Sequence, residues 1–70
     1  MTGIINNILA GTLPNTAKEL KEQMDHCEAM IEDCNETIKD PEVQQTTRND
    51  HIIFRGQARL AFATLKKIRL

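Results

Sequence analysis

The most reactive side chains in this sequence are two thiols, Cys27 and Cys34. They stand seven positions apart, so on one helix their Cα atoms lie about 10 Å apart, beyond the roughly 7 Å limit for a disulfide. The same separation prevents both thiolates from binding one zinc ion, even with His26 or His51 nearby. We therefore expect both cysteines to be buried as small apolar side chains, with a contact across a dimer interface as the alternative.

The other groups that carry chemistry do not combine into a catalytic or metal site. Sulfur ligands would suit Cu(I), but Met30 lies off the helix face that holds Cys27 and Cys34. Neither histidine has a glutamate three positions before it, so the Glu-x-x-His motif of di-iron bundles is missing. The sequence has no serine nucleophile and no Gly-rich phosphate loop. We predict that the chain is not an enzyme and binds no metal and no cofactor.

Acidic side chains are concentrated in the middle of the chain. Residues 17–40 contain eight acids and three bases, whereas residues 41–70 contain two acids and six bases. An acidic helix face can imitate nucleic-acid phosphates or bind a basic groove of a larger protein, because complementary charge makes association faster and more selective. The acidic face predicted to bind such a partner consists of Glu22, Asp25, Glu28, Glu32 and Asp33.

The basic C-terminal part offers an alternative function. Arginine and lysine bind phosphate oxygens, and Gly56 would let a phosphate approach the backbone. In a symmetric oligomer, the basic side chains would converge on a shared pocket that sequesters a nucleotide or another phosphate-bearing small molecule. The residues in question are Arg55, Arg59, Lys66, Lys67 and Arg69.

The simpler interpretation of the basic residues is pairing with the acidic half inside the fold. A hairpin would place Arg48 near Asp33, Arg55 near Asp25 or His26, and Arg59 near Glu22, although each exposed pair adds only about 0.2 to 1 kcal/mol. Nucleic acid is not expected as a partner, because a chain of net charge −1 with 3% aromatic residues has neither a basic footprint nor a stacking platform.

Helices must position these groups, and the first is predicted over residues 3–10. Within the stretch from Thr2 to Ala10, apolar and polar residues segregate to opposite sides, and Gly11 ends the helix. A helix this short is not stable alone, so it must dock. Docking on the rest of the chain is expected, with a neighbouring chain or a membrane surface as alternatives. The apolar side holds Ile4, Ile5, Ile8 and Leu9.

A long helix is predicted over residues 16–39. Thr16 and Glu19 form a capping box, in which each side chain accepts from a backbone N–H that the helix leaves free. The apolar positions then alternate at spacings of three and four, which is a seven-residue repeat. They are Ala17, Leu20, Met24, Cys27, Ile31, Cys34 and Ile38.

Asp40 and Pro41 are predicted to end this helix and begin another over residues 42–69, because Asp caps helices and Pro suits their first position. The polar residues 46–50 leave a later or frayed start open. A matching stripe follows, and the short connection makes the helices antiparallel, with Phe54 near Cys27 and Leu65 near Ala17. The stripe consists of Thr47, His51, Phe54, Ala58, Ala61, Leu65 and Ile68.

The predicted fold is therefore all-α: one domain over residues 1–70, with a short N-terminal helix and an antiparallel two-helix hairpin. One hairpin of this length buries little surface, and the last helix is apolar beyond its stripe. We therefore expect self-association into a helical dimer or higher oligomer. The interface residues would be Ile52, Ile53, Leu60, Phe62 and Leu70.

The expected setting is the cytoplasm, since residues 1–16 carry no Lys or Arg typical of a secretory signal and no stretch is apolar enough for a membrane span. In its short length, missing catalytic apparatus and self-associating hairpin, the chain is similar in general character to small accessory proteins of phages and mobile elements. That similarity implies a protein that binds and inhibits a larger host protein, and it assigns no individual residue.

Overall fold

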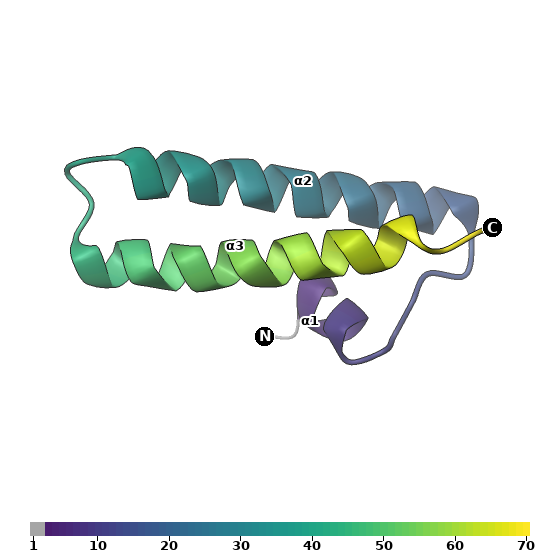
Figure 1. The fold of residues 1–70 in the computed structure, drawn as a ribbon. Coiled ribbons are helices and arrows are strands. Elements are labelled where there is room, and N and C mark those ends of the chain that lie inside the picture. The colour runs from purple at the N-terminus through teal and green to yellow at the C-terminus, as the bar shows by residue number, and fades with distance from the viewer. Residues whose placement is uncertain (1–2) are drawn as a thin grey trace.

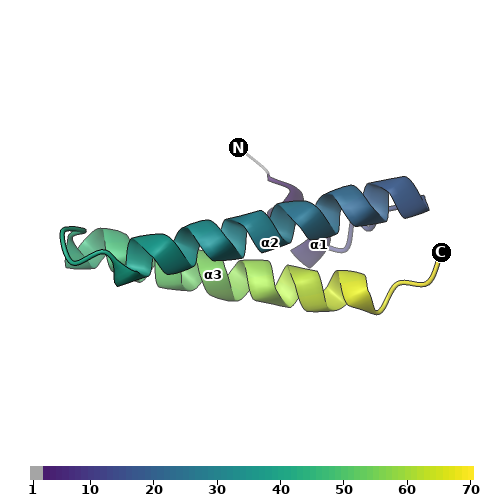
Figure 2. The same cartoon turned by 90° about the horizontal axis from the view of Figure 1, so that it is seen from above.

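The computed structural model describes residues 3–70, which contain three helices. Helix α1 is Ile4–Leu9, α2 is Ala17–Lys39 and α3 is Gln45–Lys66. Helices α2 and α3 run antiparallel, and α1 packs against α3 (Figure 1). Seen from above, α2 and α3 stay side by side and α1 lies beneath them (Figure 2). The molecule measures 42 × 19 × 18 Å, and its helical hairpin confirms the architecture predicted from the apolar spacing.

Helix α1 ends where the sequence predicts. Gly11 has a φ of +100°, a conformation that favours glycine, and its N–H donates to the Ile8 carbonyl oxygen at 3.1 Å. Ile8 is buried against the two long helices, which confirms that the segment docks on its own chain. Thr2, at the start of the predicted stretch, lies outside the described residues.

The predicted cap at the start of α2 is also present. The Glu19 N–H donates to the Thr16 Oγ1 at 3.1 Å, and the Glu19 Oε2 accepts from the Asn15 N–H at 3.1 Å. Both side chains thus satisfy backbone donors at the point where the chain leaves the loop. The second donor is one residue earlier than in the usual capping box, which ties the loop that follows α1 to α2.

The prediction that Asp40 caps the second long helix is wrong. Asp40 ends α2, and its Oδ1 accepts from the Glu42 N–H at 2.9 Å, which is a local turn. Helix α3 begins only at Gln45, without a side-chain cap, and ends at Lys66 instead of residue 69. Residues 40–44 form the connection between α2 and α3. Arg48 stabilises this connection, because its Nη2 donates to the carbonyl oxygens of Asp40 at 2.9 Å and Val43 at 3.2 Å.

This longer connection shifts α3 relative to α2 from the predicted register. Phe54 was expected opposite Cys27, yet its side chain is 50% exposed. Leu65, expected near Ala17, packs instead in one cluster with Cys27, and Ala17 is exposed. Each α3 residue therefore meets α2 at a point closer to the connection than a turn centred on Asp40 would give.

The core is small and lies where all three helices meet. Its buried members are Ile8, Cys27, Ala61 and Leu65, and partly buried apolar side chains surround them. Those surrounding residues are Ile5, Leu20, Met24, Phe62 and Ile68. Toward the connection, Cys34 and Ala58 are buried between α2 and α3 without cover from α1. A core of this size favours a chain that gains stability from a further contact.

Candidate functional site

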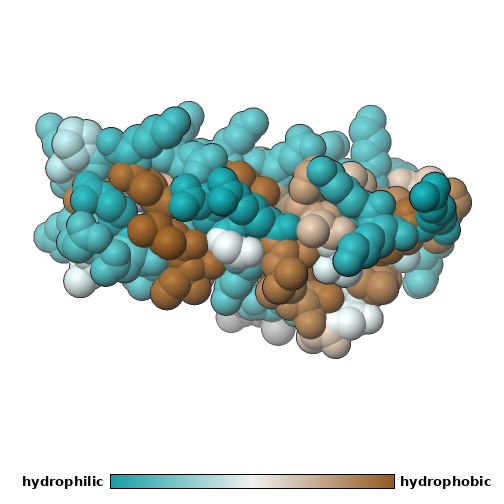
Figure 3. Space-filling model, viewed as in Figure 1, coloured by the Kyte–Doolittle hydropathy of each residue, from teal (hydrophilic) through white to brown (hydrophobic). Residues whose placement is uncertain are grey.

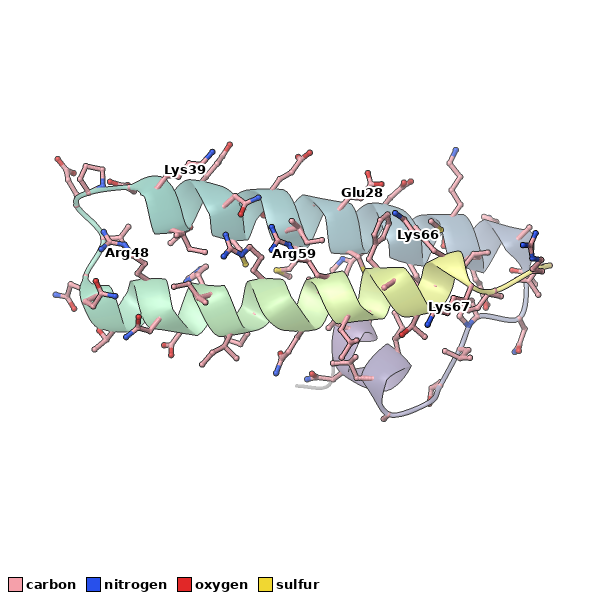
Figure 4. The ribbon with its side chains drawn as sticks, in the orientation of Figure 1. Glu28, Lys39, Arg48, Arg59, Lys66 and Lys67 are labelled. Atoms are coloured by element: carbon pink, nitrogen blue, oxygen red, sulfur yellow. The ribbon has the colours of Figure 1, made fainter. Side chains whose placement is uncertain are left out.

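The acidic face predicted from the sequence is an exposed surface of α2. Glu22, Asp25, Glu28, Glu32 and Asp33 are all exposed, and they extend over about 16 Å of helix. Glu28 points away from α3 (Figure 4). No lysine or arginine occurs between residues 22 and 36, so the face has one sign of charge throughout.

Two of the three arginines expected to pair with this face contact other groups. Arg55 was expected near Asp25 or His26, but its Nη1 donates to the Asn35 Oδ1 at 2.9 Å. Arg48 was expected near Asp33, but it binds the backbone of the connection. Both pairings are therefore wrong, because the shifted register brings these side chains to nearer oxygen acceptors. Asp25 and Asp33 are therefore not paired with these two arginines.

The five basic residues of the alternative function are divided between different contacts. Arg55 is bound to Asn35, and the Lys66 Nζ lies 4.6 Å from the centre of the Phe62 ring, a cation–π contact. Arg59 and Lys66 extend toward α2, whereas Lys67 extends from the opposite side of α3 (Figure 4). Arg69 follows the end of α3 and is exposed. The Arg55 contact thus links α3 to α2, whereas the Lys66 contact lies within α3.

An open groove of about 380 Å³ lies at the N-terminal end of α1 and is lined by residues of all three helices. Met30 and Phe54 form part of its wall, and His26 and His51 lie beside them. The His51 Nδ1 lies 2.9 Å from the Thr47 carbonyl oxygen, within hydrogen-bond distance of it. Sequence reasoning missed the groove, because its wall depends on where α1 docks.

Four of the five predicted interface residues are exposed. Ile52 is 42% exposed, and Ile53, Leu60 and Leu70 are between 59% and 62% exposed. Phe62 differs, since it packs against the core beneath Lys66. The hydropathy surface shows separate apolar areas along α3, one over its N-terminal half and one nearer α1 (Figure 3). The chain therefore presents apolar side chains that its own helices do not cover.

Both cysteines are free and buried, as predicted. Burial raises the pKa of the Cys27 thiol. Burial and the neighbouring Asp33 raise the pKa of Cys34, and Arg55 lowers it in part. A thiol with a raised pKa and no solvent access is a weak nucleophile, so neither cysteine is a candidate catalytic residue.

These pKa values predict how stability depends on pH. The folded chain holds the thiol protons more tightly than the unfolded chain, so stability is intact below the ordinary thiol pKa and falls as the pH rises past it. We expect the free energy of unfolding to decline between about pH 8 and about pH 10. Urea unfolding at several pH values measures it. The free energy of unfolding of the variant Cys27→Ala/Cys34→Ala should decline less over this pH range. Equal declines for the variant and the wild-type chain would show that the thiols do not cause the pH dependence.

Within residues 3–70, no group of three or more His, Cys, Asp or Glu side chains is placed to hold a metal ion. None of the helices described combines the length and hydropathy that a bilayer span requires. No protein-family model matches the chain, and no curated protein or solved structure matches it either.

Proposed function

We propose that this chain is a non-catalytic, self-associating helical protein that binds a larger protein through the acidic face of α2 and thereby modulates or inhibits it. The observation that carries the proposal is a row of five exposed carboxylates on α2, with Arg48 and Arg55, which were expected near Asp33 and Asp25, bound elsewhere. The partner surface would be basic, since complementary charge steers association and selects the partner.

The arrangement of the carboxylates supports a role outside the fold. Glu22 and Asp25, Asp25 and Glu28, and Glu28 and Glu32 are spaced three or four residues apart on one helix. Like charges at this spacing repel and destabilise a helix by about 0.2 to 0.5 kcal/mol per pair. A surface that lowers the stability of its own helix is readily explained by binding to something else.

The proposal includes the setting expected from the sequence. Two free, buried cysteines fit a reducing cytoplasm. Small accessory proteins of phages and mobile elements, which act by binding a larger host protein, are the type of protein that we propose.

A charge-removal experiment tests the acidic face. Immobilised chain would be used to capture proteins from a bacterial lysate, and each captured protein would be purified and titrated against the free chain. For a true target, Asp25→Asn/Glu32→Gln should raise the Kd at least about tenfold, equal to about 1.4 kcal/mol, because two charge contacts are lost. The binding of the wild-type chain should also weaken with salt.

The matched control removes two acids outside the face. Glu42→Gln/Asp50→Asn changes the net charge by the same amount, so it separates a local contact from a general effect of charge. Equal Kd values for both variants would rule out the acidic face. Circular dichroism would confirm that each variant stays helical.

A further inference from the structure

The side of α3 that faces away from α2 carries a second apolar stripe. Its residues follow spacings of three, four and three, so they line up along one side of the helix as in a coiled coil. This outer stripe consists of Ile53, Gly56, Leu60 and Ala63, all exposed. Lys67 continues the same spacing, and it extends from the side of α3 opposite α2 (Figure 4). Ile53 and Leu60 are 59% and 60% exposed, so residues 3–70 leave most of both side chains uncovered.

Within residues 3–70, no contact explains the glycine in this stripe. Gly56 lies in the middle of α3, where glycine is the least favourable residue after proline. A Cβ added to it would meet no atom within 4 Å, and its backbone does not require a positive φ. A glycine at an exposed helix position is explained when another helix approaches so closely that a side chain would separate the two backbones.

The large exposed area of the chain also favours binding to a partner. One chain exposes 5137 Å². That is about 700 Å² more than the roughly 4,450 Å² typical of a folded monomer of this mass. A stable dimer buries about 800 Å² of each partner. The excess is therefore close to what one partner of this kind would cover.

We propose that the outer stripe binds the same stripe of a second copy, with the two α3 helices antiparallel. The two-fold axis crosses α3 at the level of residue 58, on the side of the helix that carries the outer stripe. In this register Leu60 lies over the partner's Gly56, and Ile53 lies over the partner's Ala63. Every large side chain meets a small one, and the two-fold axis repeats both contacts. The small residues let the helices approach to about 8 Å, the close end of the range for packed helices.

Charge selects the antiparallel orientation. Lys67 stands on the stripe, so two parallel helices would place it against the partner's Lys67. In the antiparallel register it lies beside the partner's Asn49, away from the partner's Lys67. Opposed helix dipoles favour the same orientation. Both outer α2 faces remain exposed in this dimer, so each copy keeps its acidic face available.

Sedimentation equilibrium of the full chain over a range of concentrations tests the interface. The wild-type chain should reach twice the 8.0 kDa of one chain. Gly56→Leu fills the space for the partner's Leu60, and Leu60→Glu removes the large side chain, so each should raise the dimer Kd at least about tenfold. Both positions are exposed, and circular dichroism would show that the variants stay helical. Leu9→Glu, an exposed apolar residue outside the stripe, is the control and should leave the Kd unchanged.

A mixing experiment tests the orientation. Chains carrying Gly56→Cys and chains carrying Leu60→Cys are mixed and oxidised, and the products are identified by mass. The antiparallel register brings only the mixed pair within the roughly 7 Å Cα limit, so the mixed disulfide should predominate. Predominance of the Leu60→Cys homodimer would indicate parallel helices and overturn the register.

A wild-type chain that stays monomeric, or variants with an unchanged Kd, would overturn the interface itself. The inference rests on the self-association included in the proposed function. Its test uses no target protein, so its failure would leave binding through the acidic face untouched. Conversely, a binding result that rules out the acidic face would not change the mass of the dimer.

Discussion

Replacing Leu65 with alanine is expected to unfold a large part of the protein at room temperature. Leu65 is fully buried, and it packs with Ile8, Cys27 and Ala61 where the three helices meet. A buried Leu→Ala change costs about 2 to 5 kcal/mol, because transfer energy is lost and a cavity remains. The whole core of such a short chain contributes only about 3 to 5 kcal/mol. A loss of about 3 kcal/mol lowers the ratio of folded to unfolded chain roughly 140-fold.

Urea unfolding followed by circular dichroism measures this loss. The matched control is Leu13→Ala, the same change at a side chain that is 42% exposed, which should cost less than about 1 kcal/mol. Measurements at low protein concentration keep self-association from adding stability. Similar losses for the two variants would show that Leu65 is not the centre of the core.

Features that depend on local sequence were predicted correctly. The apolar repeat from Ala17 to Ile38 predicted α2, and both its cysteines are buried, although Ala17 is exposed. Thr16 and Gly11 marked the start of α2 and the end of α1, because a cap and a left-handed glycine act within a few residues. Such signals need no knowledge of the rest of the fold.

The start of α3 and its register were not predictable in the same way. Asp40 can cap a helix or accept from a backbone N–H two residues later, and both interactions are local and similar in energy. The structure has the second, supported by Arg48 from the first turns of α3. That contact spans eight residues and forms only when the connection folds, so the spacing of apolar residues did not reveal it.

The candidate site was likewise predictable from the sequence only in part. The exposure of the acidic face followed from the pattern of α2, since carboxylates opposite an apolar stripe face solvent. The lack of pairing between Arg55 and that face did not follow from the pattern, because Arg55 reaches Asn35 instead of a carboxylate. The outer stripe is visible in the sequence as a repeat, yet only the fold distinguishes it from the stripe that packs on α2.

Replacing Ile8 with aspartate is expected to release α1 and expose one of the two cysteines. Ile8 is the only residue of α1 that is buried, and it covers Cys27 and Leu65. A carboxylate there must reach water, so α1 would leave its position while α2 and α3 stay paired. Losing a buried isoleucine weakens docking by about 2 to 3 kcal/mol. Cys27 should then react with a thiol reagent roughly 30- to 140-fold faster, measured by mass after digestion.

Cys34 is the internal control, because it is buried between α2 and α3 away from α1. Its reaction rate should change little if only α1 is released. Ile4→Asp, on the same helix but 37% exposed, should leave the rates of both thiols close to those of the unmodified protein. Equal acceleration of Cys27 and Cys34 would mean that the hairpin itself opens without α1. In that event the two long helices depend on the short one, and the groove beside α1 would have no fixed wall.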